Sequence, residues 1–195
     1  LSGVLIVSDP TLRKGQQLSF DTFDYMNSVA VDFSMASTNV EAYSVIQNMG
    51  MVDLPTGLLS RNAYKRTLEK LVIPDGEPFA CVFVDVNGLH EMNNTYGHDK
   101  GDEMLRFVAD TMKSYFPDDE VFRIGGDEFM AFARGYSMSV IELKISHINS
   151  QIIQEGYSVS IGVEWREHDH DLNRMIKAAD QKMYAQKKLI HSRLT

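Results

Sequence analysis

The chain has little cysteine, no long apolar run and an excess of negative charge, and each of these excludes a class of protein. Cys81 is the one cysteine among 195 residues, so no disulfide framework can form, which fits a reducing compartment. No apolar stretch approaches the length of a membrane-spanning helix, and residues 4–7 are too few for a signal-peptide core. The net charge of -8 argues against nucleic acid or an anionic membrane as the main partner. We therefore expect a cytoplasmic chain without nucleic acid or direct membrane contact, although its parent protein could be membrane-anchored.

The length suits one full domain and a smaller additional segment. An apolar content of 44% is enough for a real core in a chain of 195 residues. Because the sequence begins with Leu1 rather than Met, we expect a fragment of a longer protein. Residues 1–50 carry no recognisable chemistry, but the apolar spacing over residues 39–49 favours a helix. We predict an N-terminal fragment with a helical linker over residues 1–50 and the main domain over residues 51–195.

The main domain alternates between helical and strand patterns. Helical apolar spacing predicts helices at 58–71, at two segments between 88 and 115 with a break near Gly97, at 140–153 and at 172–183. A continuous apolar run indicates a buried strand over 79–84, and alternation indicates a strand with one polar face over 157–163. This order of elements implies an α+β fold, with a mostly antiparallel central sheet flanked by helices.

The stretch from Phe122 to Phe129 organises this domain. Gly125 and Gly126 stand between two apolar runs and predict a tight β-hairpin, because its turn needs backbone freedom that glycine supplies at little cost. Asp127 and Glu128 follow immediately, so the hairpin would hold two carboxylates at a rigid tip. Gly-Gly-Asp is also ordinary turn chemistry, so the hairpin alone is explained more simply by a solvated turn.

Asp85 adds a third carboxylate at the end of the buried strand. Such a group is costly unless it is paired, metal-bound or used as a cap or turn residue. If this strand neighbours the hairpin, Asp85 and one hairpin acid could share a hard divalent ion. Mg²⁺ typically takes one or two carboxylates plus substrate phosphates, and it polarises a phosphoryl group under attack by a hydroxyl. The pattern is thus compatible with metal-dependent phosphoryl or nucleotidyl transfer, although spacing alone does not establish that the strands are adjacent.

The segment from Arg123 to Phe129 resembles the signature of the GGDEF domains, the diguanylate cyclases. Residues 53–62 resemble the Asp-x-Leu-Thr-Gly-Leu-x-Asn-Arg motif that begins these domains, with Pro55 and Ser60 as departures. Residues 158–162 resemble the family's Ser-x-Gly strand, with one extra residue or a shifted register. Residues 85–102 and 179–187 resemble its nucleotide-binding segment and its C-terminal helix. Motifs spaced over residues 53–187 make the resemblance specific.

The resemblance implies the fold of the nucleotide cyclase catalytic domain and a defined reaction. Two GTP molecules, one on each subunit of a homodimer, would condense into cyclic di-GMP with release of two pyrophosphates, with Mg²⁺ or Mn²⁺ as cofactor. The chain would be the output domain of a bacterial signalling protein, with residues 1–50 as part of the sensor. Two alternatives stay open: a catalytically weak GGDEF-like domain that binds GTP and regulates a partner, and a simple dimerisation module.

The resemblance also implies roles for individual residues. The metal ligands would be Asp85, the carbonyl of Val86 and Asp127, and the catalytic acids would be Asp127 and Glu128. Guanine donors and acceptors suit an amide and a carboxylate, and these match Asn93 and Asp102. The remaining substrate contacts would be the backbone N–H groups around residues 87–90, which include Leu89 and His90, and the side chains of Lys187 and Arg123. Arg123 could instead pair with a carboxylate of the fold.

Three departures from the family pattern bear on function. His90 stands where the family usually has a lysine that contacts phosphate. Ile190 and His191 stand in the tail where the family has Gly-Arg-Asn. Phe116 replaces the arginine of the Arg-x-x-Asp pair that forms the family's inhibitory product site, which would end at Asp119. We therefore expect altered substrate affinity and no product inhibition through that position.

Overall fold

The computed structural model describes residues 28–29, 31, 50–116 and 120–194. The chain divides into two compact units, Leu1–Met49 and Gly50–Thr195, and the account below concerns the second. The N-terminal sensor fragment and helical linker predicted over residues 1–50 lie almost entirely outside the described residues.

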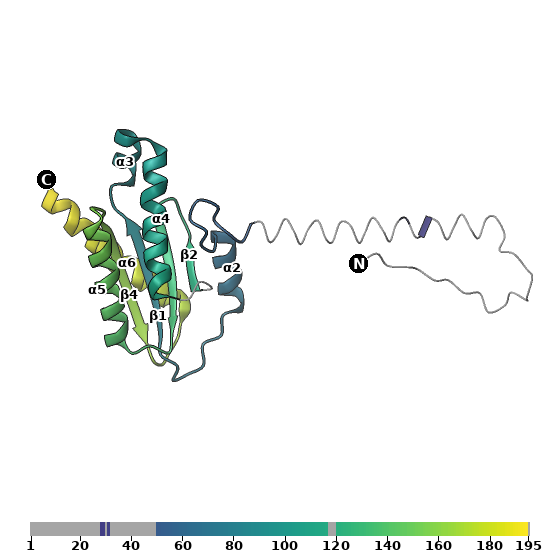
Figure 1. The fold of residues 1–195 in the computed structure, drawn as a ribbon. Helices are drawn as coiled ribbons and strands as arrows, with labels where there is room; N and C mark the ends of the chain where they lie inside the picture. Colours follow the sequence, from purple (N-terminus) through teal and green to yellow (C-terminus); the bar gives the residue numbers. More distant parts are fainter. Residues whose placement is uncertain (1–27, 30, 32–49, 117–119, 195) are drawn as a thin grey trace, which may run out of the picture. The chain divides into compact units, whose positions relative to one another are not determined.

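The described part of the second unit contains five helices and four strands (Figure 1). In chain order they are α2 (Arg61–Lys70), β1 (Phe79–Val86), α3 (Leu89–Tyr96), α4 (His98–Tyr115), β2 (Val121–Arg123), β3 (Glu128–Arg134), α5 (Met138–Gln154), β4 (Val159–Arg166) and α6 (Leu172–Leu194). The predicted order of elements is confirmed, including the helix pair that breaks at Gly97 and the hairpin between β2 and β3.

The four strands form one antiparallel sheet in the order β2-β3-β1-β4. β1 therefore lies in the interior of the sheet, with β3 and β4 on its two sides. All eight residues of β1 are buried, which explains why its sequence is a continuous apolar run rather than an alternation. The α+β prediction with a mostly antiparallel sheet is confirmed.

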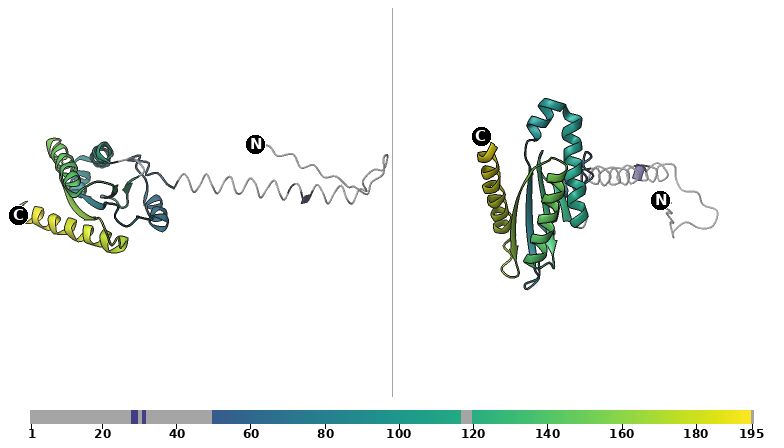
Figure 2. Two further views of the ribbon diagram at one scale, coloured as in Figure 1. Left: turned by 90° about the horizontal axis from the view of Figure 1, so that it is seen from below. Right: turned by 60° about the vertical axis from the view of Figure 1, so that its left-hand side comes forward.

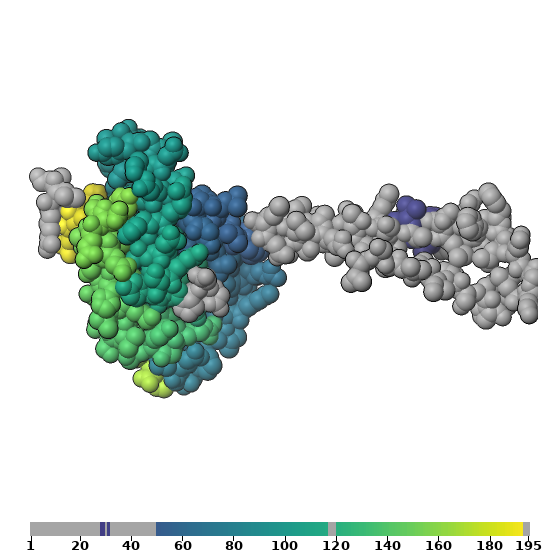
Figure 3. All heavy atoms as spheres, viewed as in Figure 1, coloured from purple at the N-terminus to yellow at the C-terminus, as the bar shows by residue number. Residues whose placement is uncertain are grey.

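Helices cover both faces of the sheet, so the domain has three layers (Figure 2). Alternate side chains of a strand point to opposite faces, and along β1 the two sets join different cores. Ala80, Val82 and Val84 pack in the core that α4 and α5 close. Phe79, Cys81 and Phe83 pack in the core that α2 and α6 close. α4 and α5 form much of the surface seen in Figure 3.

Several predicted boundaries were wrong. The helix expected over 172–183 extends to Leu194, and the strand expected over 157–163 spans Val159–Arg166. The helix expected from Leu58 begins at Arg61, because the Ser60 hydroxyl accepts hydrogen bonds from the backbone N–H groups of Asn62 and Ala63 and so caps the helix one turn later. The strand expected to stop before Asp85 continues to Val86, because β4 pairs with it through that residue. Asp85 thus interrupts the apolar run in the sequence, but the pairing of β1 with β4 continues past it.

Gly162 fixes where α6 lies on the sheet. A Cβ atom at this position would collide with the backbone of Ala179 and Met183, so helix and strand approach more closely than any other residue would permit. Gly162 belongs to the segment Ser160-Ile161-Gly162, which matches the Ser-x-Gly strand without an extra residue. This is the shifted register of the two alternatives considered, and it stays a prediction.

We predict that Gly162→Ala destabilises the domain by about 2–3 kcal/mol, because backbone atoms cannot move aside as a flexible side chain can. Urea denaturation followed by circular dichroism measures this change. Gly126→Ala is the matched control for stability, since a Cβ at Gly126 would meet no atom within 4 Å. Equal midpoints for the two variants would contradict the close approach of α6.

Candidate functional site: an acidic cluster at the end of β1

The end of β1 and the tip of the β2–β3 hairpin bring the predicted carboxylates together. Asp85 pairs directly with Glu128 in the β1–β3 register and with Ser160 in the β1–β4 register. By the alternation along each strand, Asp85 shares a face with Phe83, and Glu128 shares a face with Met130, and both of these pack in the core under α6. The two strands, whose adjacency the sequence left open, are direct neighbours.

Backbone hydrogen bonds hold the hairpin tip against β1. The N–H of Val86 donates to the carbonyl of Asp127 at 2.9 Å, and the N–H groups of Ile124 and Gly125 donate to the carbonyl of Glu128 at 2.9 and 3.3 Å. The side chain of Val86 has no donor atom, so only its backbone carbonyl could serve as a ligand. Asp127 is half-buried in the turn, and the hydrogen bond to its backbone carbonyl fixes the main chain there.

Lys187 is the cation of this cluster. It reaches from α6 to Asp85, where its Nζ lies 2.7 Å from Oδ1 and donates a hydrogen bond to Oδ2 at 2.8 Å. Oδ1 is buried and has no hydrogen-bond partner with good geometry among the described residues. One oxygen of Asp85 is thus left with unused acceptor capacity in the middle of the site.

Burial and mutual repulsion disfavour the ionised forms of these acids. Burial raises the pKa of Asp85, and the hydrogen bond and charge of Lys187 only partly offset this, while Asp127 adds to it. Burial raises the pKa of Glu128 as well, with further contributions from Asp127 and Asp85. Perturbed acids gathered at one point are typical of functional sites, because a fold gains nothing in stability from a costly charge.

The loop between β1 and α3 presents the start of a helix to this cluster. Gly88 adopts a left-handed conformation (φ 75°) at the N-cap of α3, and no side chain caps the helix there. The first N–H groups of α3, including those of Leu89 and His90, therefore point outward as a potential anion cradle. The N–H of Asn87, which we predicted to share in this cradle, instead donates to the Ser158 carbonyl at 2.9 Å. Because this N–H group is already hydrogen-bonded within the fold, the potential anion cradle has fewer N–H groups than predicted.

Sequence reasoning did not identify the side-chain contacts of Asn87. Its Nδ2 donates to Ser158 Oγ at 3.0 Å, and its Oδ1 accepts from Ser160 Oγ at 2.9 Å. These bonds tie the cradle loop to β4. The polar face of the alternating strand was the signal in the sequence, but it did not indicate which loop those serines would meet.

Asn93 and Asp102, the predicted guanine readers, are brought to the junction of α3 and α4. A Cβ at Gly101 would collide with the side-chain amide of Asn93, so this amide lies directly against α4 beside Asp102. His90 lies elsewhere on α3, where its Nε2 is 3.0 Å from Asn94 Nδ2 and the ring is exposed. The His90 side chain is therefore held by a neighbour one turn along the helix.

Arg123 forms the carboxylate pair that we considered as its alternative role. Its Nη1 lies 3.0 Å from Asp53 Oδ2, and its Nη2 donates to the Gly126 carbonyl at 2.6 Å. Asp53 also accepts from the backbone and hydroxyl of Thr56. The Asp-x-Leu-Thr-Gly-like segment therefore braces the hairpin turn through Arg123, and a phosphate contact of this arginine stays a prediction.

The donor set fits a divalent metal whose coordination is completed by a substrate. No three His, Cys, Asp or Glu side chains within the described ranges converge closely enough to enclose a metal by themselves. Asp85, Asp127 and the Val86 carbonyl are oxygen donors on adjacent strand ends, and Asp85 Oδ1 has no hydrogen-bond partner among the described residues. Two carboxylates with remaining positions for water and phosphate are what Mg²⁺ commonly uses.

Phe116, at the position of the missing inhibitory-site arginine, is a core residue. It is buried at the end of α4, and the Lys144 ammonium lies 5.6 Å from its ring centroid. Asp119, the expected partner of that site, lies outside the described residues. The buried ring leaves no guanidinium at this position to bind a phosphate of the product.

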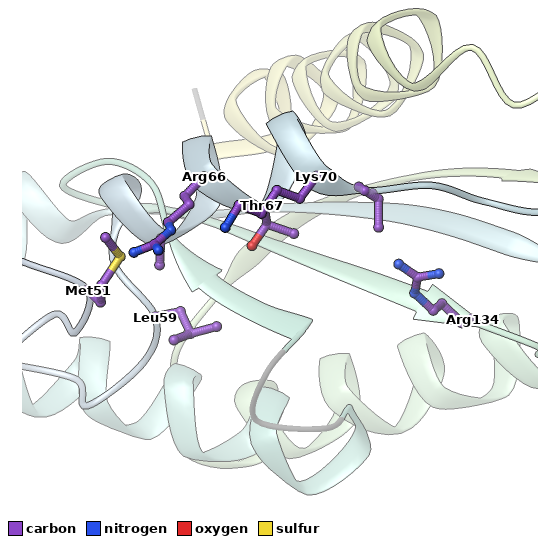
Figure 4. Close-up of a pocket in the computed structure, with 8 residues that line it drawn as sticks. Met51, Leu59, Arg66, Thr67, Lys70 and Arg134 are labelled. Carbon is purple, nitrogen blue, oxygen red and sulfur yellow. The ribbon is translucent and has the colours of Figure 1, made fainter. Parts of the chain in front are cut away.

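A separate groove of about 430 Å³ lies along α2 (Figure 4). Arg66 and Lys70 line it from α2, and Arg134 lines it from the end of β3 opposite to Glu128. Its floor is apolar, with Met51 and Leu59 among the lining residues. None of the predicted site residues lines this groove.

Comparison with known proteins agrees with the fold. The family model described as "Diguanylate cyclase, GGDEF domain" matches residues 50–193. The chain belongs to the GGDEF domain family.

The relatives include, by name, a cyclic di-GMP phosphodiesterase and a probable diguanylate cyclase. The chain is 32% identical over 146 residues to the cyclic di-GMP phosphodiesterase PdeR of Escherichia coli, covering 69% of this chain and 22% of PdeR. It is 30% identical over 159 residues to the probable diguanylate cyclase DgcI of the same species, covering 80% of this chain and 35% of DgcI. The chain thus spans about a fifth to a third of the length of these relatives.

Other relatives are described as membrane proteins. One is an uncharacterized membrane protein of Staphylococcus haemolyticus, 30% identical over 159 residues, with 72% of this chain and 44% of that protein covered. In the part of the chain that the structure describes, no helix is long and apolar enough to cross a membrane.

Solved structures share the fold of the domain. A microbial GGDEF domain described for its interaction with cyclic di-GMP is similar with a TM-score of 0.63 and 25% identity, covering 71% of this chain and 93% of that one. The active GGEEF domain of a diguanylate cyclase from Vibrio cholerae is similar with a TM-score of 0.53 and 26% identity, covering 65% and 83%. The fold is that of the nucleotide cyclase catalytic domain, as the resemblance implied.

Proposed function

We propose that this domain is a diguanylate cyclase that condenses two GTP molecules into cyclic di-GMP and two pyrophosphates. The observation that carries the proposal is the direct pairing of Asp85 with Glu128 beside Asp127, at the open end of a buried strand. Membership of the GGDEF family and the similarity to DgcI support the same reaction.

In the proposed site, each group has a separate task. Asp85, Asp127 and the Val86 carbonyl would hold Mg²⁺ or Mn²⁺, which supplies charge stabilisation at the α-phosphate and helps ionise the attacking 3′-hydroxyl. The uncapped first turn of α3 would bind phosphate oxygens through its N–H groups. Lys187 would neutralise phosphate charge from the opposite side, and Glu128 would act as the second acid of the signature.

The proposal requires two subunits, because each chain offers one nucleotide site and the product joins two nucleotides. We therefore expect a homodimer for catalysis, with each 3′-hydroxyl attacking the α-phosphate held by the other subunit. Below the dimer dissociation constant, the rate should rise faster than linearly with protein concentration. The test is the rate of product formation across a dilution series, with sedimentation velocity at the same concentrations. A rate per subunit that stays constant where only monomer sediments would exclude the two-subunit mechanism.

Base selection tests the guanine-reading part of the proposal. Asp102 would accept hydrogen bonds from guanine N1–H and the 2-amino group, and inosine lacks the 2-amino group. The intact protein should therefore bind GTP about tenfold more tightly than ITP, and Asp102→Ala should abolish that difference. Calorimetric titration measures both affinities.

The matched control for this experiment is Asp99→Ala, which removes the same charge in the first turn of the same helix. It should keep the preference for GTP over ITP. If Asp102→Ala retains that preference as well, another group reads the 2-amino substituent.

A second function is favoured by one observation at the cradle. His90 stands where the family usually has a phosphate-contacting lysine, and its Nε2 lies 3.0 Å from Asn94 Nδ2, so that lysine contact to phosphate would be absent. A domain that binds GTP, turns it over slowly and regulates a partner would fit this loss. Measured turnover of GTP separates the two functions.

A further inference from the structure

The close packing of α6 determines where Lys187 lies. The contact of Gly162 with the backbone at Ala179 and Met183 sets the register of α6 along β4. Lys187 lies one helical turn beyond Met183, and this turn delivers its side chain to the end of β1. The placement of the ammonium beside Asp85 is thus built into the packing of the helix on the sheet.

The ammonium of Lys187 lies close to both oxygens of Asp85 and donates its hydrogen bond to Oδ2. Its Nζ lies 2.7 Å from Oδ1 and 2.8 Å from Oδ2. The Asp85 side chain is only 5% exposed, whereas that of Lys187 is 30% exposed. The acid is therefore fixed inside the fold, while the cation that covers it can move toward solvent without disturbing the core.

We propose that Lys187 is a removable counter-ion, whose ammonium pairs with the proposed metal ligand Asp85 when metal and nucleotide are absent. The inference rests on the proposed function for its divalent metal. A metal ion bound to Asp85 would lie close to the ammonium, and because two cations at one carboxylate repel each other, metal binding would weaken the hold of Lys187 on Asp85. In the proposed site the ammonium would then pair with the triphosphate. Metal entry is thereby coupled to nucleotide binding, because the cation that loses Asp85 gains a phosphate.

The direct test uses Mn²⁺ alone as the probe, without nucleotide, and follows free Mn²⁺ by electron paramagnetic resonance. Lys187→Met should bind Mn²⁺ about tenfold more tightly than Lys188→Met, because only the first removes the competing ammonium. Lys188 is the matched control, since it is the next residue of α6 and its ammonium lies over the Tyr184 ring, 4.5 Å from the centroid. Equal Mn²⁺ affinities for the two variants would overturn the inference.

A second variant and a second readout guard against misfolding and misplaced metal. Lys187→Gln keeps a hydrogen-bond donor for Asp85 without the charge, and should show the same direction of change. Asp85→Asn combined with Lys187→Met should lose the tight Mn²⁺ site, and a tight site that survives places the metal elsewhere and overturns the inference. Lys187→Met without metal should melt at a lower temperature than Lys188→Met, and Mn²⁺ should restore most of the difference. A difference in melting temperature that Mn²⁺ leaves unchanged also counts against the inference.

This inference and the proposed function fail in distinguishable ways. A protein that forms cyclic di-GMP but shows equal Mn²⁺ affinities in the two lysine variants keeps its function and refutes the role of Lys187. Tighter Mn²⁺ binding by Lys187→Met in a protein that forms no cyclic dinucleotide supports the counter-ion role and refutes the cyclase reaction.

Discussion

Asp127→Asn should lower cyclic di-GMP formation by at least about 100-fold while leaving the fold intact. The amide keeps the size of the side chain but removes the charge that would hold the divalent metal. The fold should survive because Asp127 is only half-buried and its structural contact is made by its backbone carbonyl, which accepts from the N–H of Val86. The measurement is the steady-state rate with saturating GTP and Mg²⁺.

The matched control for this variant is Asp110→Asn, which removes an exposed carboxylate from α4. It should keep the full rate. Thermal melting should show both variants folded. If Asp127→Asn retains more than about a tenth of the rate at saturating Mg²⁺, the carboxylate is not a metal ligand.

Asp85→Asn should also abolish product formation, but it should leave the stability of the fold unchanged or increase it. Because the pKa of Asp85 is raised, chiefly by burial, the fold disfavours its ionised form. The intact protein at neutral pH therefore carries a destabilising charge that Asn does not have. We expect the variant to unfold at the same urea concentration as the intact protein or at a higher one, with activity lost by about 100-fold or more.

The dependence of this stability difference on pH follows from the direction of the shift. A carboxyl whose pKa is raised in the fold favours folding when protonated, and this advantage is lost as pH rises through its folded pKa. Lowering the pH toward the ordinary value of about 3.9 for Asp should therefore narrow the gap between Asp85→Asn and the intact protein. A variant that is clearly less stable at pH 7 would show that the Lys187 pair stabilises the fold more than burial of the carboxylate opposes it.

The sequence predicted the mostly antiparallel sheet and the β-hairpin because these depend on local patterns. The apolar run at β1 and the Gly125-Gly126 turn each specify a strand or a hairpin with little help from distant residues. Carboxylates at strand ends come together when the strands pair. The proximity of Asp85 and Glu128 therefore required, beyond these two local patterns, the assumption that the two strands are neighbours, and the β1–β3 register shows that they are.

Contacts between distant segments were not predictable in the same way. The bonds from Asn87 to Ser158 and Ser160 and the pair between Arg123 and Asp53 join positions about 70 residues apart. Polar side chains at such positions have several possible partners, and only the three-dimensional packing selects one. The predicted start of α2 was wrong for a different, local reason. The Ser60 hydroxyl caps the helix, and this hydrogen bond competes with the helical apolar pattern from which the start was predicted.

The measurement that tests the account most directly is the product formed from GTP. Purified protein is incubated with GTP and Mg²⁺, and the nucleotides are resolved by chromatography and identified by mass spectrometry. We predict cyclic di-GMP with two pyrophosphates released for each molecule formed. GTP that is bound but recovered unchanged at dimer-forming protein concentrations would contradict the cyclase account and leave a GTP-binding GGDEF domain.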